Sequence, residues 1–437
     1  MDNDKLMNEV LGGGLRALTK LADSPLVERF GLQDRTRKLV YEGARRAAET
    51  AQRLSTKPNG TPTTPARKFD LSLSEEQQLM RDTLRRFADD VMQPAARQAD
   101  DTSAPPDDFL DTFAELGAVA MSVPEDLGGA AENVSAVSQM LIVEDLSRGD
   151  MGLAFAALSS LSFVNALVQG GSDSQRATLL PPLVEGEEAR ASVAVVEPHA
   201  FFDPAALRTT AKRKGDGLVV SGEKSMVAIA GQAEWFLVAV NIAKVGPRFV
   251  IVERSAEGLE VQPESAMGLG SAALGRLRFN KVRVGLDAVL GGEAALGPGG
   301  QAAYDDSVNR GRVAWGAMAL GTSQAMLDYV IPYCNERIAF GEPISHRQAV
   351  AFMIANIGIE LESMRMLVYR AAGRLDAGLP CGREAYLART LCADKAMEIG
   401  TNGVQLLGGA GFIKDHPVET WYRQLRSIGV MDGNLLL

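Results

Sequence analysis

The sequence has few of the residues that build metal centres and disulfide frameworks. Three cysteines are spread over 437 residues without a CxxC pair, so neither a disulfide framework nor a zinc ribbon is encoded, and a reducing compartment fits. The three histidines include no pair at the i, i+3 or i, i+4 spacing of helical metal ligands. We therefore expect no metal site.

A secretory leader and a membrane span are not indicated either. The chain begins Met-Asp-Asn-Asp and lacks the basic start and apolar core of a signal peptide. Residues 151–172 carry no charge, but they include Asn165 and Gln169 and end near Gly170 and Gly171, which favours a buried core helix. We expect a cytoplasmic protein.

Positive charge is also in deficit. Lys and Arg number 45 against 55 Asp and Glu, a formal net charge of −10, so nucleic-acid backbones are poor partners. Residues 1–65 are an exception, because they combine predicted amphipathic helices of positive bias with a proline-containing linker. We expect this extension to pack on the acidic body of the protein, with peripheral contact to an anionic membrane as the alternative.

Hydrophobic periodicity divides the rest of the chain into helical, β-rich and helical parts. The hydrophobic content of 46% and the length allow about three domains with sizeable cores. The last β-rich run, 276–284, alternates apolar and polar residues apart from one slip at Asn280 and Lys281. Long helical periodicity then returns at 313–333, 349–376 and 383–407.

These patterns predict an α+β fold in four parts. The parts are the extension 1–65, a helical domain 66–190, a β-domain 191–300 and a helical bundle 301–437. Within the β-domain, residues 214–217 (Lys-Gly-Asp-Gly) are typical of a hairpin turn.

The glycine-rich stretches give no dinucleotide fingerprint. Gly268, Gly270 and Gly275 do not form GxGxxG, and no βαβ unit surrounds them, so a Rossmann site is not expected. Residues 408–411 follow a long helix and, taken alone, are typical of a helix C-cap and turn. Any dinucleotide would therefore have to bind in another way.

Four groups of motifs resemble the acyl-CoA dehydrogenase family and occur in the family's order. They are MSVPEDLGG (121–129), the flavin-loop segments SVAVVEPHAFFDP (192–204) and GEKSMVAIAGQAEWFLVA (222–239), YCNERIAFGEPISHRQAVAFMIA (333–355) and VQLLGGAGFIKDHPVETWYRQLR (404–426). The resemblance covers residues 69–434. It implies an N-terminal helical domain, a central β-barrel or sandwich domain and a C-terminal four-helix bundle. It also implies FAD-dependent α,β-dehydrogenation of an acyl-CoA in fatty acid metabolism.

The resemblance implies that FAD binds between subunits of a homodimer or homotetramer. Arg337, Phe340 and Gln348 of one subunit, with Gln405 and Gly409 of its neighbour, would contact the diphosphate and adenine. The residue types suit this role: a guanidinium offers a donor fork to phosphate, and glycine allows close backbone approach.

Asp432 falls on the family's catalytic-base position, which commonly holds a glutamate. A carboxylate there would remove the α-proton of the thioester, and it must lie within reach of that proton. Asp432 is one methylene shorter, and a misplacement of about 1 Å can cost on the order of a hundredfold in rate. The alternative interpretation is an aspartate that caps a turn before Gly433.

Four other positions are implied flavin contacts. Val196 and Ala228 replace two threonines of the family's flavin loops, Met226 replaces a tryptophan that usually covers the ring, and Asn434 follows Asp432. Backbone amides can still bind flavin N5 and O4, so loss of the hydroxyls would alter redox tuning without abolishing binding.

Three functional hypotheses follow. The first is an acyl-CoA dehydrogenase that passes electrons to an electron-transfer flavoprotein. The second is a catalytically weak subunit of a heteromeric acyl-CoA dehydrogenase. The third is a flavin oxidase of the same fold, like nitroalkane oxidase, which uses an aspartate base. A yellow purified homomer separates the first and third from the second, and enoyl-CoA formation separates the first from the third.

Overall fold

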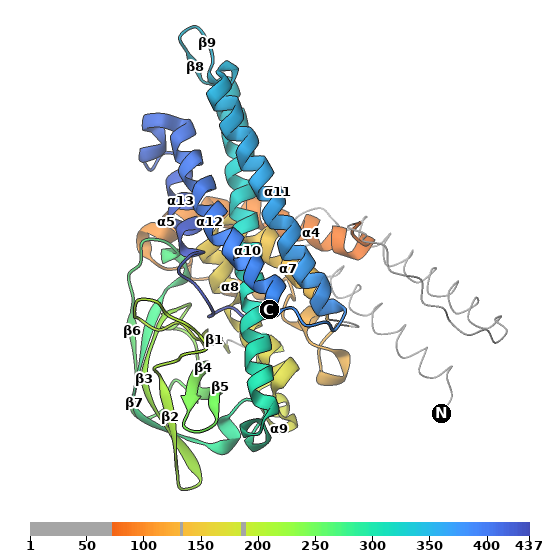
Figure 1. Ribbon diagram of the computed structural model, residues 1–437, viewed down its shortest axis with the longest axis vertical. Helices are drawn as coiled ribbons and strands as arrows, with labels where there is room; N and C mark the ends of the chain where they lie inside the picture. Colours follow the sequence, from red (N-terminus) through yellow and green to blue (C-terminus); the bar gives the residue numbers. More distant parts are fainter. Residues whose placement is uncertain (1–71, 132–133, 185–188) are drawn as a thin grey trace, which may run out of the picture.

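The computed structural model describes residues 72–131, 134–184 and 189–437 of the chain. The predicted extension 1–65 lies outside the described residues. Figure 1 shows a β-domain beside the lower part of a long helical bundle, with the N-terminal helices packed around the middle of that bundle. The predicted order of helices, sheet and helices is confirmed.

The N-terminal part is helical. Its helices are α4 (Glu75–Phe87), which continues through a π turn (Ala88–Met92) into α5 (Gln93–Thr102), then α6 (Phe109–Ala114), α7 (Ala136–Gly149), α8 (Met151–Gly170) and α9 (Asp173–Val184). Ser74 begins the first helix with a capping box, because its Oγ accepts the N–H of Gln77 at 3.1 Å and Gln77 Oε1 accepts the N–H of Ser74 at 3.0 Å.

Helix α8 is the described helix that is long and apolar enough to cross a membrane. Its mean hydropathy reaches 1.8, and 89% of the apolar window is buried inside the protein. The hydroxyl of Ser159 lies 3.1 Å from the carbonyl oxygen of Ala191 and 2.9 Å from the hydroxyl of Ser192. The helix therefore packs in the core and contacts the first strand of the β-domain.

The β-domain contains a seven-stranded sheet. Its strands are β1 (Ala191–Ala194), β2 (Thr210–Lys214), β3 (Gly217–Val227), β4 (Trp235–Ile242), β5 (Gly246–Glu253), β6 (Leu259–Pro263) and β7 (Gly275–Gly285). The order is β1-β4-β2-β3-β7-β6, with β5 paired to β4. Strand β1 is parallel to β4, and most other pairs are antiparallel.

One local prediction in this domain is confirmed, and one irregularity of the sequence pattern is explained. The predicted turn at 214–217 joins β2 to β3, and Gly215 there has φ +65°. The slip at Asn280 and Lys281 is a β-bulge, since the register between β3 and β7 shifts there and Lys281 has φ +57°.

The C-terminal part is a bundle of long antiparallel helices. It contains α10 (Gly299–Glu336), the hairpin of β8 (Ile338–Ala339) and β9 (Glu342–Pro343), α11 (Gln348–Asp376), α12 (Gly382–Leu407) and α13 (Val418–Ser427). Helix α12 ends at Leu407, and the predicted cap is confirmed, because Gly408 is its C-cap with a φ of +58°. Helix α10 begins at Gly299, well before the predicted start at 313. Its first turns bury one face made of Gly300, Tyr304, Val308 and Gly311, and because two of these four residues are glycines the apolar periodicity is weak.

Beyond α13 the chain turns back into the protein. Residues 431–437 are all buried, and Figure 1 shows this segment passing between the β-domain and α10. Leu435 and Leu437 join the apolar cluster of the bundle, whereas Leu436 joins a cluster with β-domain residues. The segment therefore connects the two halves of the structure.

Candidate functional site

The predicted site residues form two groups. Asp432 and Asn434 lie where the β-domain meets α10, beside Val196, Met226 and Ala228. The second group lies at the end of the bundle away from the β-domain in Figure 1 and comprises Arg337, Phe340, Gln348, Gln405 and Gly409. One chain therefore brings the predicted base and the flavin-facing positions together, but not the residues predicted to hold the diphosphate and adenine.

Asp432 is held by arginines from two helices of the bundle. Its two oxygens accept hydrogen bonds from Nε and Nη2 of Arg312 on α10, at 3.0 and 3.2 Å. Nε of Arg389 on α12 lies 3.4 Å from the second oxygen, and Asp432 is only 7% exposed. Within the described residues, this carboxylate accepts its hydrogen bonds from Arg312 and not from the turn before Gly433. A bidentate guanidinium fixes both the position and the plane of the carboxylate.

Position 433 requires a glycine, because the backbone there passes closely between α10 and the residue that follows β1. Its carbonyl oxygen accepts a hydrogen bond from Nε1 of the buried Trp315 at 2.7 Å. Its φ is +128°, and an added Cβ would lie 2.5 Å from Cβ of Val195. A larger residue would therefore displace the segment that carries Asp432.

Asn434 connects the ends of two strands. Its Oδ1 accepts the backbone N–H groups of Val195 at 2.5 Å and Val196 at 3.0 Å. Its Nδ2 donates to the carbonyl oxygens of Ser225 at 2.9 Å and Met226 at 2.7 Å. Asn434 is 1% exposed, with φ +62°. Its amide therefore uses both acceptor sites and both donors on the backbone of the β-domain.

The predicted flavin-facing positions are covered within this chain. Val196 is 4% exposed and Ala228 is fully buried. The backbone N–H of Met226 donates to a carboxylate oxygen of Glu264 at 2.8 Å, and its φ is +57°. The carbonyl oxygen of Ala228 accepts a hydrogen bond from Ser192 Oγ at 2.8 Å.

A buried ion pair between Lys224 and Glu197 contacts the backbone at the end of β1. Lys224 Nζ donates to Glu197 Oε1 and to the carbonyl oxygen of Val195, both at 2.9 Å. Burial lowers the pKa of Lys224 to about 8, and the charge of Glu197 partly offsets this effect. Burial alone would raise the pKa of Glu197, but Lys224 and the backbone N–H groups of Thr209 and Arg208 outweigh it and lower that pKa to about 2. Both side chains are therefore ionised at neutral pH.

The second group of predicted residues is exposed to solvent. Phe340 is 96% exposed at the tip of the β8–β9 hairpin, with φ +54°, and the Arg347 guanidinium carbon lies 5.9 Å from its ring centre. Arg337, Gln348 and Gln405 are also exposed. An added Cβ at Gly409 would meet no atom within 4 Å. These residues are available to a ligand or to a second subunit.

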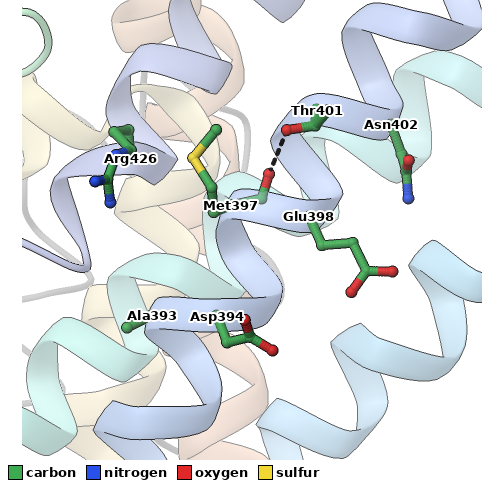
Figure 2. Close-up of a pocket in the computed structure, with 7 residues that line it drawn as sticks. All are labelled: Ala393, Asp394, Met397, Glu398, Thr401, Asn402 and Arg426. Carbon is green, nitrogen blue, oxygen red and sulfur yellow. Dashed lines mark hydrogen bonds between the residues drawn. The ribbon is translucent and has the colours of Figure 1, made fainter.

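A shallow surface pocket lies on α12 and ends one helical turn before Gln405. Figure 2 shows it along one side of α12, next to α13, where Thr401 Oγ1 donates to the carbonyl oxygen of Met397 at 2.9 Å. It is lined by Ala393, Asp394, Met397, Glu398, Thr401, Asn402 and Arg426. None of these is a predicted site residue.

The sequence analysis did not identify Arg312, which binds Asp432, or Lys224, which binds the backbone beside Val196. Arg312 lies on α10 two residues after Arg310, and Lys224 follows Glu223 inside β3, so no lone charge in an apolar run marks either residue in the sequence. The side chain of Lys224 is fully buried in the fold. The partners of both residues come only from the fold, because Arg312 and Asp432 are 120 positions apart.

Three family models match consecutive parts of the chain. They describe the N-terminal, middle and C-terminal domains of acyl-CoA dehydrogenases and match residues 74–187, 192–282 and 299–435. An acyl-CoA dehydrogenase of Bacillus subtilis (strain 168) is 31% identical over 370 residues, which are 83% of this chain and 96% of that protein.

Solved structures give the same similarity. Butyryl-CoA dehydrogenase from Megasphaera elsdenii has a TM-score of 0.76 and 26% identity, over 84% of this chain and 96% of that one. A glutaryl-coenzyme A dehydrogenase in complex with glutaryl-CoA has a TM-score of 0.76 and 27% identity, over 84% of this chain and 94% of that one.

Proposed function

The chain belongs to the acyl-CoA dehydrogenase family and is an FAD-dependent oxidoreductase with that family's fold, and from this premise we propose that it oxidises an acyl-CoA thioester to its 2-enoyl product with Asp432 as the base. The observation that carries the proposal is the buried carboxylate of Asp432 at the junction of the bundle and the β-domain. A base in such a site acts away from competing water.

The residues of this chain divide the work as follows. The Asp432 carboxylate takes the α-proton onto one of its oxygens. Arg312 and Arg389 orient that carboxylate, and Trp315 fixes the backbone beside it through Gly433. The shorter reach of aspartate makes this orientation important, since the base must approach the proton within hydrogen-bond distance.

The two groups of site residues suit different parts of FAD. The exposed guanidinium of Arg337, the ring of Phe340 and the open backbone at Gly409 suit a diphosphate and an adenine. The N–H groups of Val195 and Val196 suit a flavin ring, although Asn434 uses them here. When bound, FAD would accept the β-hydride of the substrate.

We also propose that FAD binds between subunits of a homodimer or homotetramer. The second group of residues lies far from the β-domain of its own chain (Figure 1). Large apolar side chains are exposed nearby on α11, where Phe352, Ile359 and Met366 recur every seven residues and are 59%, 62% and 46% exposed. Exposed apolar stripes of this kind are typical of subunit interfaces. An electron-transfer flavoprotein is the proposed electron acceptor.

A catalytically weak subunit of a heteromer is the second candidate. It is favoured by Asp432, because both of its oxygens are already bound by Arg312. A flavin oxidase that uses Asp432 as its base, like nitroalkane oxidase, is the third candidate function.

The flavin spectrum of the purified protein tests these proposals together. We expect a yellow homomer whose flavin band bleaches with one or more acyl-CoAs of a chain-length panel, and mass spectrometry should detect the enoyl-CoA when an artificial acceptor is supplied. A colourless homomer that gains flavin only with a paralogue would support the weak subunit. Bleaching by a nitroalkane alone would support the oxidase.

A further inference from the structure

We infer that Asn434 is a positioning residue for the proposed reaction, because it fixes the segment that carries Asp432 to the ends of β1 and β3. The inference rests on the proposed function, in which Asp432 takes the α-proton. Asn434 lies two residues after Asp432 and is 1% exposed. Arg312 and Arg389 hold the side chain of Asp432 from the bundle, whereas Asn434 holds the same segment from the β-domain.

The contacts with β1 bring the backbone of the base segment close to that strand. Asn434 Oδ1 accepts the N–H groups of Val195 at 2.5 Å and Val196 at 3.0 Å. At Gly433 the approach is so close that an added Cβ would lie 2.5 Å from Cβ of Val195. Aspartate has the shorter of the two carboxylate side chains, so its backbone must lie near the proton that it removes. The close approach to β1 therefore matches the short reach of Asp432.

The contacts with β3 fix a bulge at the end of that strand. The register between β3 and β7 shifts here, and Met226 within the bulge has φ +57°. Asn434 Nδ2 donates to the carbonyl oxygens of Ser225 at 2.9 Å and Met226 at 2.7 Å. Glu264 accepts the hydroxyl of Ser225 and the N–H of Met226, both at 2.8 Å. Asn434 thus holds the carbonyl groups of the bulge, while Glu264 holds its donors.

The position requires an asparagine. Its φ is +62°, a conformation that asparagine adopts more readily than most residues. The carboxamide offers two lone pairs and two N–H donors, and the backbone of the two strands uses all of them. Aspartate would offer no donor to the carbonyl oxygens, and leucine would offer neither donor nor acceptor. The side chain is therefore suited to join two strands to the base segment.

The consequence for the reaction is a fixed placement of the base relative to the flavin-facing positions. Val196 and Met226 are implied flavin contacts, and Asn434 binds the backbone of both. The proton and the hydride leave adjacent carbon atoms of the substrate, so the base and the flavin ring must be held in register. Loss of the amide should slow this step without weakening the binding of substrate.

Single-turnover bleaching of the full-length protein, expressed per bound flavin, tests the inference. The substrate is the acyl-CoA of the chain-length panel that bleaches the parent fastest. In Asn434→Ala the rate at saturating acyl-CoA should fall about a hundredfold, while the half-saturating concentration stays that of the parent. Asn165→Ala is the matched control and should keep the parent's rate, because Asn165 is also 1% exposed but binds Gln139 between α7 and α8.

Three outcomes of this experiment decide against a proposal. The parent's rate in Asn434→Ala would overturn the inference. Loss of FAD from Asn434→Ala would also overturn it, because Asn434 would then be a flavin ligand. Failure of every acyl-CoA to bleach the parent would instead overturn the proposed function.

A rescue experiment separates positioning from a purely structural role. Asp432→Glu lengthens the base by one methylene and so recovers reach that is lost when the segment moves away from β1. In the Asn434→Ala background it should raise the rate about tenfold, and more than it does in the parent. Asn434→Asp gives the same comparison with a smaller disturbance, because it keeps the oxygen that faces Val195 and Val196. Independent effects of the two substitutions in both backgrounds would overturn the inference.

Discussion

Arg312 binds both carboxylate oxygens of Asp432, at 3.0 and 3.2 Å, and so ties the proposed base to the middle of α10. The side chain of Arg312 is 19% exposed and that of Asp432 is 9% exposed, so the pair is largely shielded from solvent. Removal of either partner leaves a desolvated charge on the other, and the two predictions that follow separate the catalytic part of this contact from its structural part.

Asp432→Asn should remove turnover and keep flavin. The amide has nearly the shape of the carboxylate but is not basic, and a positioned general base contributes on the order of 100- to 10,000-fold to rate. Steady-state assays with an artificial acceptor measure the loss, and the flavin absorbance of the same sample measures occupancy. Asp216→Asn, in the exposed β2–β3 turn, is the matched control and should be fully active. Full turnover by Asp432→Asn with every substrate tested would end the assignment of this base.

Arg312→Gln should destabilise the fold. Asp432 stays buried but loses two charge-assisted hydrogen bonds, so the free energy of unfolding should fall by about 1–3 kcal/mol. Urea titration followed by circular dichroism measures this change. Arg310→Gln is the control on the same helix, because its pair with Asp306 lies on the surface and contributes less than about 1 kcal/mol. Equal effects of the two substitutions would show that the Asp432 contact adds no more stability than the surface pair of Arg310 and Asp306.

Much of the fold follows from local patterns in the sequence. Alternation along β7 is consistent with its one exposed face, and the slip at Asn280, from which no bulge was predicted, coincides with the bulge. The glycine at 408 predicted the end of α12. The start of α10 was not predicted, because the face that its first turns bury carries only two large apolar side chains, Tyr304 and Val308, between Gly300 and Gly311. Periodicity reports burial on one face and is weak where a helix is half-exposed.

The sequence predicted individual residues of the candidate site but not the contacts between them. Asp432 and Asn434 were identified from the motif after α13, but their partners come from α10, α12 and the strands. A motif gives the residue at a position and says nothing of which distant side chain meets it. The contact between Asn434 and β1 depends on how the bundle packs on the sheet, and a single sequence does not encode that packing in any local pattern.

Glu197→Gln should flatten the acid dependence of stability. The pKa of Glu197 in the folded protein is about 2 against an ordinary value of 4.5, so its contribution is full above pH 4.5 and is lost as pH falls toward 2. The variant lacks this loss, although it should be about 3–5 kcal/mol less stable at pH 7, since the fully buried Lys224 loses its charged partner.

Unfolding free energies at pH 5 and pH 3 measure the effect of Glu197. The difference between the two pH values should be smaller in Glu197→Gln than in the parent. Glu260→Gln, at an exposed position on β6, is the control and should keep the parent's difference. An identical pH dependence in parent and Glu197→Gln would mean that the carboxylate titrates alike in the folded and unfolded states.

Arg337→Ala should release FAD and leave the fold intact. The side chain is exposed at the end of α10, so its removal should not cost stability, while the diphosphate would lose a charge-assisted contact of about 1.5–3 kcal/mol. Flavin fluorescence after gel filtration measures the release, and thermal unfolding checks the fold. Arg383→Ala is the control, because this arginine is 75% exposed on α12 and no flavin contact is proposed for it. Retention of flavin by Arg337→Ala would argue against a diphosphate site there.

Mixing two defective variants tests whether the FAD site is shared between subunits. In a symmetric dimer with shared sites, a hybrid of Arg337→Ala and Gln405→Ala has one site that carries both substitutions and one that carries neither. Random exchange of subunits makes about half of the dimers hybrids, so about a quarter of all sites should regain FAD although each variant alone binds poorly. If Arg337 and Gln405 of one chain formed a single site, every site would keep one substitution and mixing would restore nothing. Recovery of flavin on mixing therefore requires that the two exposed positions at the end of the bundle belong to one site built from two chains.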